Sequence, residues 1–198
     1  MIAIIDYGMG NLRSVQKALE YIGAQTQITS DPSAIEKADR VILPGVGAYR
    51  DCIHMLQESG MAAIVQGVIE QKKPLLGICV GMQLLFASSD EGGYFEGLNI
   101  FADSITKLKT DQKIPHMGWN QVQATTSSAL LQGVNGENFY FVHSYAAHAV
   151  GAPYVAGTTD YGVPFVSCVQ QEYVMGTQFH PEKSGEAGLT LLQNFLKI

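Results

Sequence analysis

The sequence predicts a mixed α/β fold, with a mostly parallel central sheet flanked by helices and additional antiparallel strands in its second half. Up to about Asp90, apolar runs alternate with amphipathic stretches, as in strands joined by crossover helices. From about Gly92, short β-rich pieces follow one another too closely for such helices, so antiparallel pairing is expected. No linker and no internal repeat interrupts the 198 residues, and we expect one domain over residues 1–198.

The first half supplies the parallel strands. The apolar run Ile2 to Ile5 predicts a buried strand, and the helix that follows has Asn11 as its expected N-cap and Gly23 as its expected C-cap. Next come a strand over 25–28, a short helix capped by Asp31-Pro32, a buried strand over 40–43, and helices near 51–58 and 61–72. Ligands bind at the sheet edge where parallel strands end. We therefore expect three features to meet at that edge of the sheet: the turn at 6–11, the turn at 44–47 and Cys79.

The second half supplies short strands and a closing helix. Strands are expected within residues 99–108, 121–125, 138–142, 154–158, 165–169 and 173–178. The final helix should run from Gly185 to Leu196, with an apolar stripe made by Leu189, Leu192 and Leu196.

Composition excludes several classes of protein. The chain is 46% hydrophobic and 15% charged, and no apolar run approaches the roughly 20 residues of a membrane helix. The first residues form a strand and not a signal peptide, and three cysteines without CxxC spacing indicate free thiols in a reducing cytoplasm, with no zinc framework. A net charge of −6 without a basic stripe argues against nucleic acid as a partner. We expect a cytoplasmic protein without metal or cofactor.

The stretch from Leu75 to Gln83 suggests a nucleophile. An apolar run predicts a buried strand, and Met82, Leu84, Leu85 and Phe86 predict the apolar side of a following helix. Between them lies Cys79, with Gly77 and Gly81 two residues away on either side, as a strained strand-to-helix turn requires. The N–H groups at the start of that helix would favour the thiolate. Taken alone, the stretch is equally compatible with a cysteine that packs as a small hydrophobe.

A candidate base lies near the end of the chain. The predicted strand VMGTQF runs into His180, which can accept a thiol proton and later donate it to a leaving amine. Pro181 fixes one backbone angle, so the carboxylate of Glu182 could turn back and orient the imidazole. A lone core histidine before a solvated turn is the alternative, and the Gly-x-Cys-x-Gly stretch favours the catalytic interpretation.

Acyl transfer also needs donors for a developing oxyanion. The backbone N–H of Val80, directly after Cys79, is one candidate. The loop Pro44 to Gly47 is the other, because its glycines allow a peptide plane to approach a substrate or to rotate. A tight turn between strand and helix would explain the same loop.

Together these motifs resemble the class I (triad) glutamine amidotransferases, whose fold is flavodoxin-like. The segments that carry the resemblance are GICVGMQ, PGVG and FHPEKS. Within this family, the chain most resembles the glutaminase subunits of imidazole glycerol phosphate synthases, on the basis of the segments DYGMGNLRSV, PGVGAYRDC, IPHMGWNQV and FVHSY. The likeness extends from the first strand to the last helix. Val80 replaces an expected leucine and Tyr49-Arg50 replace an expected Phe-Gly, which leaves the chemistry unaffected.

The resemblance implies a mechanism. Cys79 would attack the side-chain amide of glutamine, His180 would carry the proton, and Glu182 would orient His180. Residues implied to contact the substrate are Gly45, Val46 and Gly47 at the oxyanion loop, with Val80, and Gln83, Ser144 and Tyr145 at the amino-acid end of glutamine. His143 is expected to be a structural histidine and not a second base.

The resemblance also implies a partner. Ammonia is protonated and lost in water, so a glutaminase without an acceptor domain should dock on one. The family's partner is a (β/α)8-barrel cyclase, which uses the ammonia to form imidazole glycerol phosphate and an aminoimidazole-carboxamide ribotide. The positions implied at this heterodimer interface are Asn11, Trp119, Asn120, Tyr140 and Lys183. Without the resemblance, Trp119 would be interpreted as a core aromatic.

Three alternatives remain open at this point. The chain could supply ammonia to another acceptor, such as the partner for anthranilate or for pyridoxal phosphate synthesis, although the DYGMGN and PHMGWN segments argue against it. It could be a silent binding module, which would be expected to lack part of the triad. It could also be a cysteine hydrolase of another amide, which would need a substrate pocket without Gln83 and the HSY segment.

Overall fold

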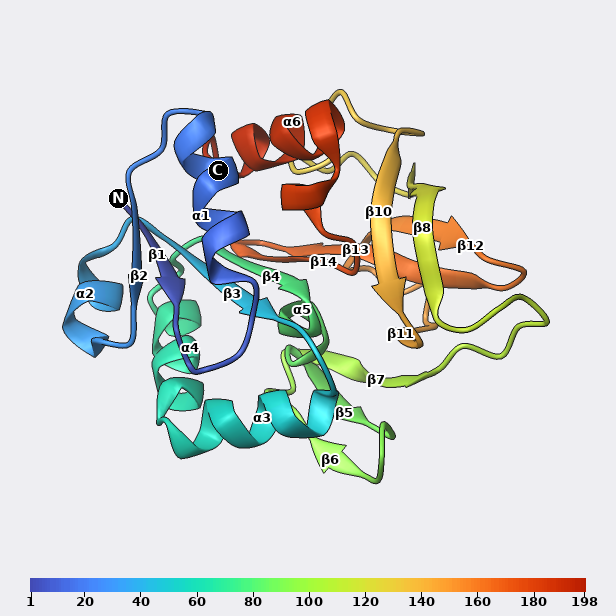
Figure 1. Ribbon diagram of the computed structural model, residues 1–198, viewed down its shortest axis with the longest axis horizontal. Coiled ribbons are helices and arrows are strands. Elements are labelled where there is room, and N and C mark those ends of the chain that lie inside the picture. The colour runs from blue at the N-terminus through green and yellow to red at the C-terminus, as the bar shows by residue number, and fades with distance from the viewer.

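The computed structural model describes residues 1–198, and its largest element is a sheet of eight strands (Figure 1). In spatial order these strands are β2 (Thr26–Thr29), β1 (Ile2–Ile5), β3 (Arg40–Gly45), β4 (Leu75–Cys79), β14 (Val174–Thr177), β13 (Pro164–Gln171), β12 (Val155–Asp160) and β9 (Gln123–Ala124). The strands from β2 to β14 are parallel, and β13, β12 and β9 continue the sheet antiparallel. The predicted mixed, mostly parallel sheet is therefore confirmed.

Helices cover the parallel part of this sheet. α1 (Leu12–Tyr21) and α6 (Gly185–Phe195) lie on one side, and α3 (Tyr49–Glu58) and α4 (Met61–Glu70) lie on the other (Figure 1). The short α2 (Pro32–Lys37) is capped by the Asp31 side chain, which accepts a 3.0 Å hydrogen bond from the Ser33 N–H. Asn11 is at the N-cap position of α1 as predicted, but its side chain makes no capping hydrogen bond.

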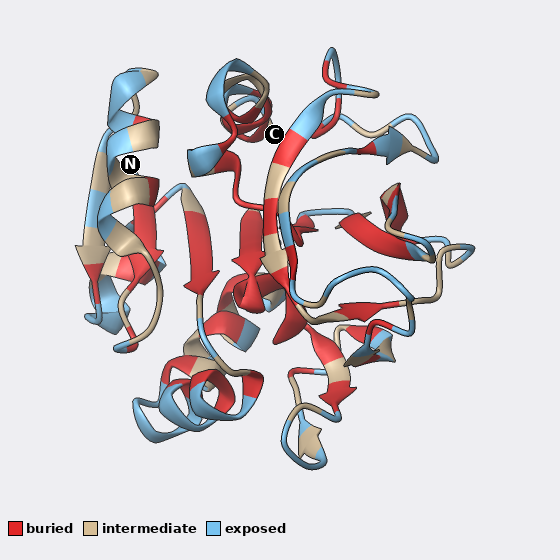
Figure 2. Ribbon diagram, turned by 45° about the vertical axis from the view of Figure 1, so that its right-hand side comes forward, coloured by how far each residue is buried: buried red, intermediate tan, exposed pale blue.

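Burial explains the apolar runs that the sequence displays. Every residue of β1, β4 and β14 is buried, because helices or other strands cover both faces of the sheet there (Figure 2). The predicted stripe on the last helix is only partly correct. Leu192 is buried as expected, but Leu189 and Leu196 are half-buried, and Leu191 and Phe195 complete the core face.

Two smaller sheets complete the second half. One has the order β11 (Tyr145–Ala147), β7 (Phe101–Lys107), β5 (Phe86–Ser89), β6 (Phe95–Glu96), and the other is a ribbon of β10 (Asn138–His143) and β8 (His116–Gln121). Antiparallel pairing holds for most of these strands, but β5 and β7 are parallel. The strand β8 is not predicted by the sequence pattern, which is interrupted by Gly118.

The helix predicted after Cys79 is much shorter than expected. α5 spans only Val80–Gln83, and Phe86 begins a strand. The carbonyls of Leu84 and Leu85 accept backbone hydrogen bonds from Leu98, Ile100 and Phe101 at 2.8 to 3.1 Å, so strand pairing replaces the helical ladder. The Phe86 ring packs on Phe101 with centroids 5.2 Å apart. Distant partners thus override the local helical periodicity, and the prediction of a helix over Leu84 to Phe86 is wrong.

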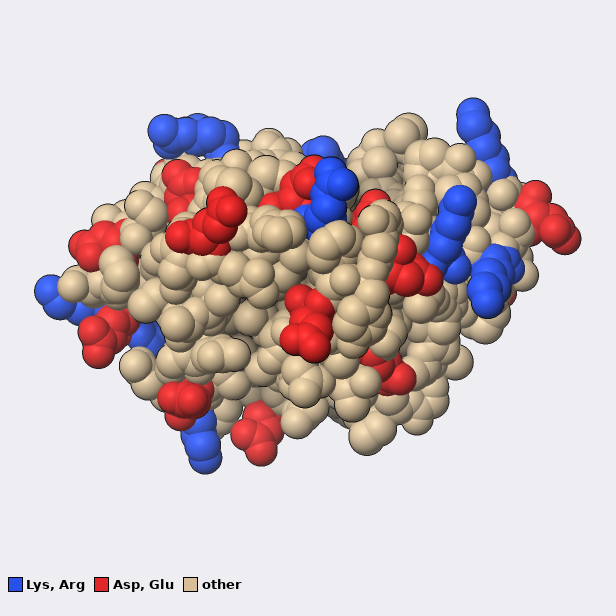
Figure 3. Space-filling view, turned by 90° about the horizontal axis from the view of Figure 1, so that it is seen from below, with Lys and Arg blue, Asp and Glu red and all other residues tan.

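The surface carries no concentrated positive charge on the face shown in Figure 3, where Lys and Arg side chains are scattered among Asp and Glu. None of the helices combines the length and the hydropathy needed to cross a membrane.

Candidate active site

Cys79 occupies a strained turn at the carboxyl end of β4. Its φ is +56° and its ψ is −113°, values that a residue with a side chain adopts only under constraint. A Cβ on Gly81 would lie 1.9 Å from the Leu43 carbonyl oxygen, and one on Gly77 would lie 2.8 Å from backbone atoms of Gly81 and Met82. Both glycines are therefore required for the backbone to pack around the cysteine, as the sequence predicts.

Replacing Gly81 tests this packing. We expect Gly81→Ala to lower the unfolding free energy by about 3 kcal/mol, because the new methyl group must displace the β3 backbone. Gly67→Ala is the matched control. No atom lies within 4 Å of its added Cβ, so the variant should gain about 0.5 to 1 kcal/mol from better helix propensity. Urea unfolding measures both changes, and a Gly81→Ala protein as stable as the wild type would contradict this packing.

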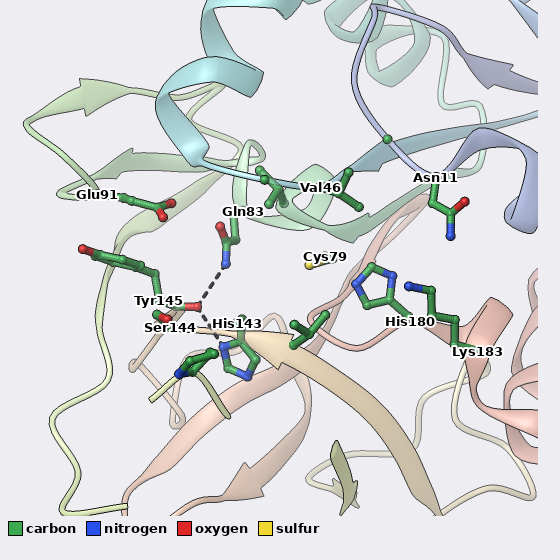
Figure 4. Close-up of a pocket in the computed structure, with 15 residues that line it drawn as sticks. Asn11, Val46, Cys79, Gln83, Glu91, His143, Ser144, Tyr145, His180 and Lys183 are labelled. Atoms are coloured by element: carbon green, nitrogen blue, oxygen red, sulfur yellow. Dashed lines mark hydrogen bonds between the residues drawn. The ribbon is translucent and has the colours of Figure 1, made fainter. Parts of the chain in front are cut away.

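The strand beside β4 delivers the candidate base. Thr177 of β14 pairs with Ile78, so the chain leaving β14 passes the cysteine and places His180 beside it at the cavity (Figure 4). The His180 Nδ1–H donates a 2.8 Å hydrogen bond to Glu182 Oε1, and both side chains are buried. Burial alone would lower the pKa of His180, but the neighbouring Cys79 and Glu182 raise it to about 10. The three predicted triad residues therefore lie together, with His180 between a thiol and a carboxylate.

Cys79 and His180 open onto a cavity of about 630 Å³. Of the residues predicted to act in the site or at an interface, those that line the cavity are Asn11, Val46, Gly47, Cys79, Val80, Gln83, Ser144, Tyr145, His180 and Lys183. Gly45, Glu182, Trp119, Asn120 and Tyr140 are not among the residues that line the cavity. Since Gly10 and Asn11 also line the cavity, the three turns expected at one sheet edge do meet there.

The loop at the end of β3 packs directly on the cysteine turn. Gly45 pairs with Cys79, and a Cβ at Gly45 would lie 2.5 Å from the Gly81 nitrogen. Two buried side chains hold the loop's carbonyls: the Tyr7 hydroxyl donates to the Pro44 oxygen at 2.8 Å, and the Cys52 thiol donates to the Val46 oxygen at 3.3 Å. The loop is thus anchored next to the sulfur, where its backbone N–H groups could meet an oxyanion.

The other end of the cavity is polar. Gln83 Nε2 donates to the Tyr145 carbonyl at 3.0 Å, and Ser144 lies beside it (Figure 4). Glu91, which is not among the predicted site residues, also lines the cavity, and its Oε2 accepts a 2.8 Å hydrogen bond from the Tyr49 N–H. A carboxylate there could pair with an ammonium group of a ligand. No local sequence pattern marks Glu91, because the strand that precedes it, β5, is not predicted from the sequence. No three His, Cys, Asp or Glu side chains are grouped so as to hold a metal ion.

An aromatic patch lies on the β8–β10 ribbon beside the cavity. Trp119 is 58% exposed and packs edge-on against Tyr140, with ring centroids 6.2 Å apart. The Lys183 ammonium lies 5.8 Å from the Tyr140 ring centroid, and Met117 on the same strand is 62% exposed. Trp119 is therefore a surface residue, and the interpretation of it as a core aromatic is wrong.

Two histidines of this ribbon are buried and neutral. His116 Nδ1 and His143 Nε2 are 3.0 Å apart, and burial lowers the pKa of His116 to about 4 and that of His143 to about 3. His143 is thus a poor base at neutral pH, in agreement with the structural role expected for it.

The decrease in the free energy of unfolding at acid pH should depend on these two histidines. In the unfolded chain both rings bind a proton near pH 6.5, whereas the folded rings do so only near pH 4 and 3. The contribution of the neutral rings to the free energy of unfolding is therefore fully present above pH 6.5 and is lost as the pH falls below 6.5. Each ring should add a slope of up to about 1.4 kcal/mol per pH unit. In urea unfolding at a series of pH values, the unfolding free energy of His143→Phe should fall less steeply below pH 6.5 than that of the wild type. An identical pH dependence would contradict a lowered pKa of His143.

Comparison with known proteins agrees with this geometry. The sequence pattern of the family described as "Glutamine amidotransferase class-I" matches residues 3–198. Among curated proteins, the chain is 50% identical to the imidazole glycerol phosphate synthase subunit HisH of Moorella thermoacetica, over 98% of this chain and 93% of that protein. It is 47% identical to the subunit of the same name from Syntrophotalea carbinolica, over 98% of each. The chain belongs to the HisH family of class-I glutamine amidotransferases.

Solved structures support the fold of this HisH-family chain. A structure described as a glutamine amidotransferase superposes with a TM-score of 0.76 at 16% identity, over 98% of this chain and 99% of that one. The PurLQS structure from Thermotoga maritima gives a TM-score of 0.78 at 18% identity, over 99% and 97%. As a member of the family, the chain is a glutamine amidotransferase.

Proposed function

We propose that the chain hydrolyses glutamine to glutamate and ammonia through a thioester on Cys79. One observation carries the proposal. A cysteine on a strained strand end faces a histidine from the neighbouring strand, and that histidine is bonded at 2.8 Å to a buried carboxylate. This is the arrangement that activates a nucleophile for acyl transfer. Residues 1–198 would act as one amidotransferase domain.

The reaction would proceed in two halves. The Cys79 sulfur bonds to the amide carbon while His180 holds the thiol proton, and the C–N bond then breaks as that proton passes to the leaving nitrogen. Ammonia departs and leaves a glutamyl thioester. Water then gives a proton to His180 and bonds to the same carbon, and the C–S bond breaks to release glutamate. Glu182 keeps Nδ1 protonated, so that Nε2 of His180 faces the sulfur.

The cavity offers partners for the rest of glutamine. The backbone N–H of Val80, with those of Val46 and Gly47, would stabilise the oxyanion. Gln83, Ser144 and Tyr145 would hold the amino-acid end, and the Glu91 carboxylate in the same cavity supports an ionic contact with the α-ammonium group. Gly45 would serve by letting the loop approach the sulfur.

We also propose that the ammonia passes to a cyclase subunit with a (β/α)8-barrel fold, in a heterodimer that forms imidazole glycerol phosphate and an aminoimidazole-carboxamide ribotide in histidine biosynthesis. The names of the relatives support this acceptor. The exposed Trp119, with Tyr140 and Lys183 packed beside it, supports a docking surface next to the cavity. Asn11 and Asn120 are the polar positions proposed for the same interface.

The test is glutamate release by the chain alone, with the candidate cyclase, and with the cyclase and its nucleotide ligand. Stimulation by the liganded cyclase is expected in the wild type and not in Cys79→Ala. Strong turnover without the cyclase, or no response to it, would contradict the coupled mechanism and favour a different acceptor. We hypothesise that the Pro44 to Gly47 loop moves between resting and productive orientations when the cyclase binds its ligand.

A further inference from the structure

A row of buried polar groups connects β8 to the cysteine sulfur, and of its side chains the proposed mechanism uses only Gln83. Four side chains of this row are almost completely buried: His116 is 2% exposed, His143 6%, Gln83 2% and Gln178 0%. Burying polar groups is costly unless each is hydrogen-bonded, and these are bonded to one another.

The direction of each hydrogen bond in the first part of the row is determined by the carbonyl of Tyr145. A carbonyl only accepts, so His143 Nδ1, 3.0 Å away, must carry the proton. His143 Nε2 is then the acceptor, and His116 Nδ1 donates to it at 3.0 Å. This leaves His116 Nε2 to accept from Asn120 Nδ2 at 3.3 Å. Both rings thus have one defined tautomer.

The same carbonyl determines the second part. It accepts a second hydrogen bond, from Gln83 Nε2 at 3.0 Å (Figure 4). The other hydrogen of that amide goes to Gln178 Oε1, also at 3.0 Å. Because the oxygen of Gln178 is used in this way, its Nε2 is the atom that faces the sulfur of Cys79, at 3.8 Å. The Gln83 oxygen makes no hydrogen bond within the protein and is left for a ligand in the cavity.

We propose that Gln178, His143 and His116 are positioning residues for glutamine hydrolysis, which orient the Gln178 N–H toward the Cys79 sulfur and the Gln83 oxygen toward the substrate. This proposal rests on the proposed role of Cys79 as the nucleophile. An N–H that faces sulfur stabilises the thiolate over the thiol, whereas the amide oxygen in that place would repel it. The row also begins on β8, the strand that carries the exposed Trp119.

The central experiment measures the titration of the thiol directly. The alkylation rate of Cys79 by iodoacetamide is followed against pH, with peptide mass spectrometry separating Cys79 from Cys52 and Cys168. We expect Gln178→Glu to raise the midpoint for Cys79 by about one pH unit or more, and Gln178→Met by less, because the first adds a repelling oxygen and the second only removes a donor. The titratable groups that face Cys79 are His180, Tyr7 and Cys52, and they are unchanged in both variants.

Steady-state kinetics with the liganded cyclase provide the second readout. Gln178→Glu should lower kcat at least about tenfold, and His143→Phe, which keeps an aromatic ring next to Phe165 but breaks the row, should raise KM for glutamine at least about threefold. Ser167→Ala is the matched control. This buried hydroxyl has no hydrogen-bond partner although the Ser167 carbonyl bonds the Gln178 N–H, so its loss should change neither quantity.

The outcomes separate the two proposals. If the wild-type protein releases no glutamate, even with the cyclase, the proposed function is overturned. The pH midpoints of Cys79 alkylation would still test whether Gln178 orients an N–H toward the sulfur. Unchanged midpoints and unchanged kcat in both Gln178 variants would overturn the positioning role while leaving the proposed function in place. If Gln178→Glu does not fold, the alkylation midpoint and the kcat of Gln178→Met decide whether Gln178 has the positioning role. Lower stability with an unchanged midpoint would assign Gln178 a structural role only and would also overturn the proposal.

Discussion

Cys79→Ala should lower glutamine hydrolysis by at least about 10⁴-fold, because the covalent route disappears with the sulfur. The other catalytic groups cannot compensate for its loss. His180 would still be held by Glu182, but it would have no thiol from which to take a proton. The substitution should leave the fold intact, since alanine occupies less space than cysteine.

A second buried cysteine provides the control. Cys168 is completely buried in β13, and burial raises the pKa of its thiol, so it should be inert. Cys168→Ala should cost about 1 kcal/mol of stability, measured by urea unfolding, and leave kcat unchanged. Full activity in Cys79→Ala, or an equal loss in both variants, would contradict the assignment of the nucleophile.

Glu182→Gln should have the next largest effect, lowering kcat by about 10³-fold. The substitution removes the negative charge 2.8 Å from His180 Nδ1, which is one of the groups that raise the pKa of His180. The imidazolium formed during the reaction then loses its stabilising partner. Because that charge develops in the transition state, kcat should fall much more than KM rises.

The control is Glu186→Gln, the same change at an exposed position in the first turn of α6. It should leave both constants unchanged. Initial rates over a range of glutamine concentrations, with the liganded cyclase present, separate kcat from KM. Weaker glutamine binding at an unchanged kcat would show that Glu182 holds substrate and does not orient His180.

Local chemistry made the triad predictable from the sequence. The Gly-x-Cys-x-Gly pattern is visible in the sequence, although the contact that excludes a side chain at Gly81 comes from the Leu43 carbonyl oxygen of β3, 1.9 Å from an added Cβ. His180 and Glu182 are two residues apart, so their hydrogen bond is also local. The parallel pairing of β14 with β4 then brings the two motifs together at the sheet edge where they were expected to meet.

Features that depend on distant partners were not predictable in this way. Phe86 lies in a strand because residues 98–101 bind the backbone before it, and no local pattern reports those partners. The His116–His143 hydrogen bond joins residues 27 positions apart, and Gln178 meets Gln83 across 95 positions. Trp119 lies on the surface because its strand pairs only with β10, which leaves one side of the ribbon exposed.

The most direct test of the proposed chemistry is to capture the covalent intermediate. Wild-type protein turning over glutamine with the liganded cyclase is quenched in acid, digested, and analysed by mass spectrometry for a glutamyl group on each of the three cysteine peptides. The peptide containing Cys79 should carry the glutamyl group, in larger amount in Glu182→Gln if release of the thioester is slowed more than its formation. Glutamyl groups on Cys52 or Cys168, or steady turnover without any labelled cysteine, would contradict a thioester mechanism at Cys79.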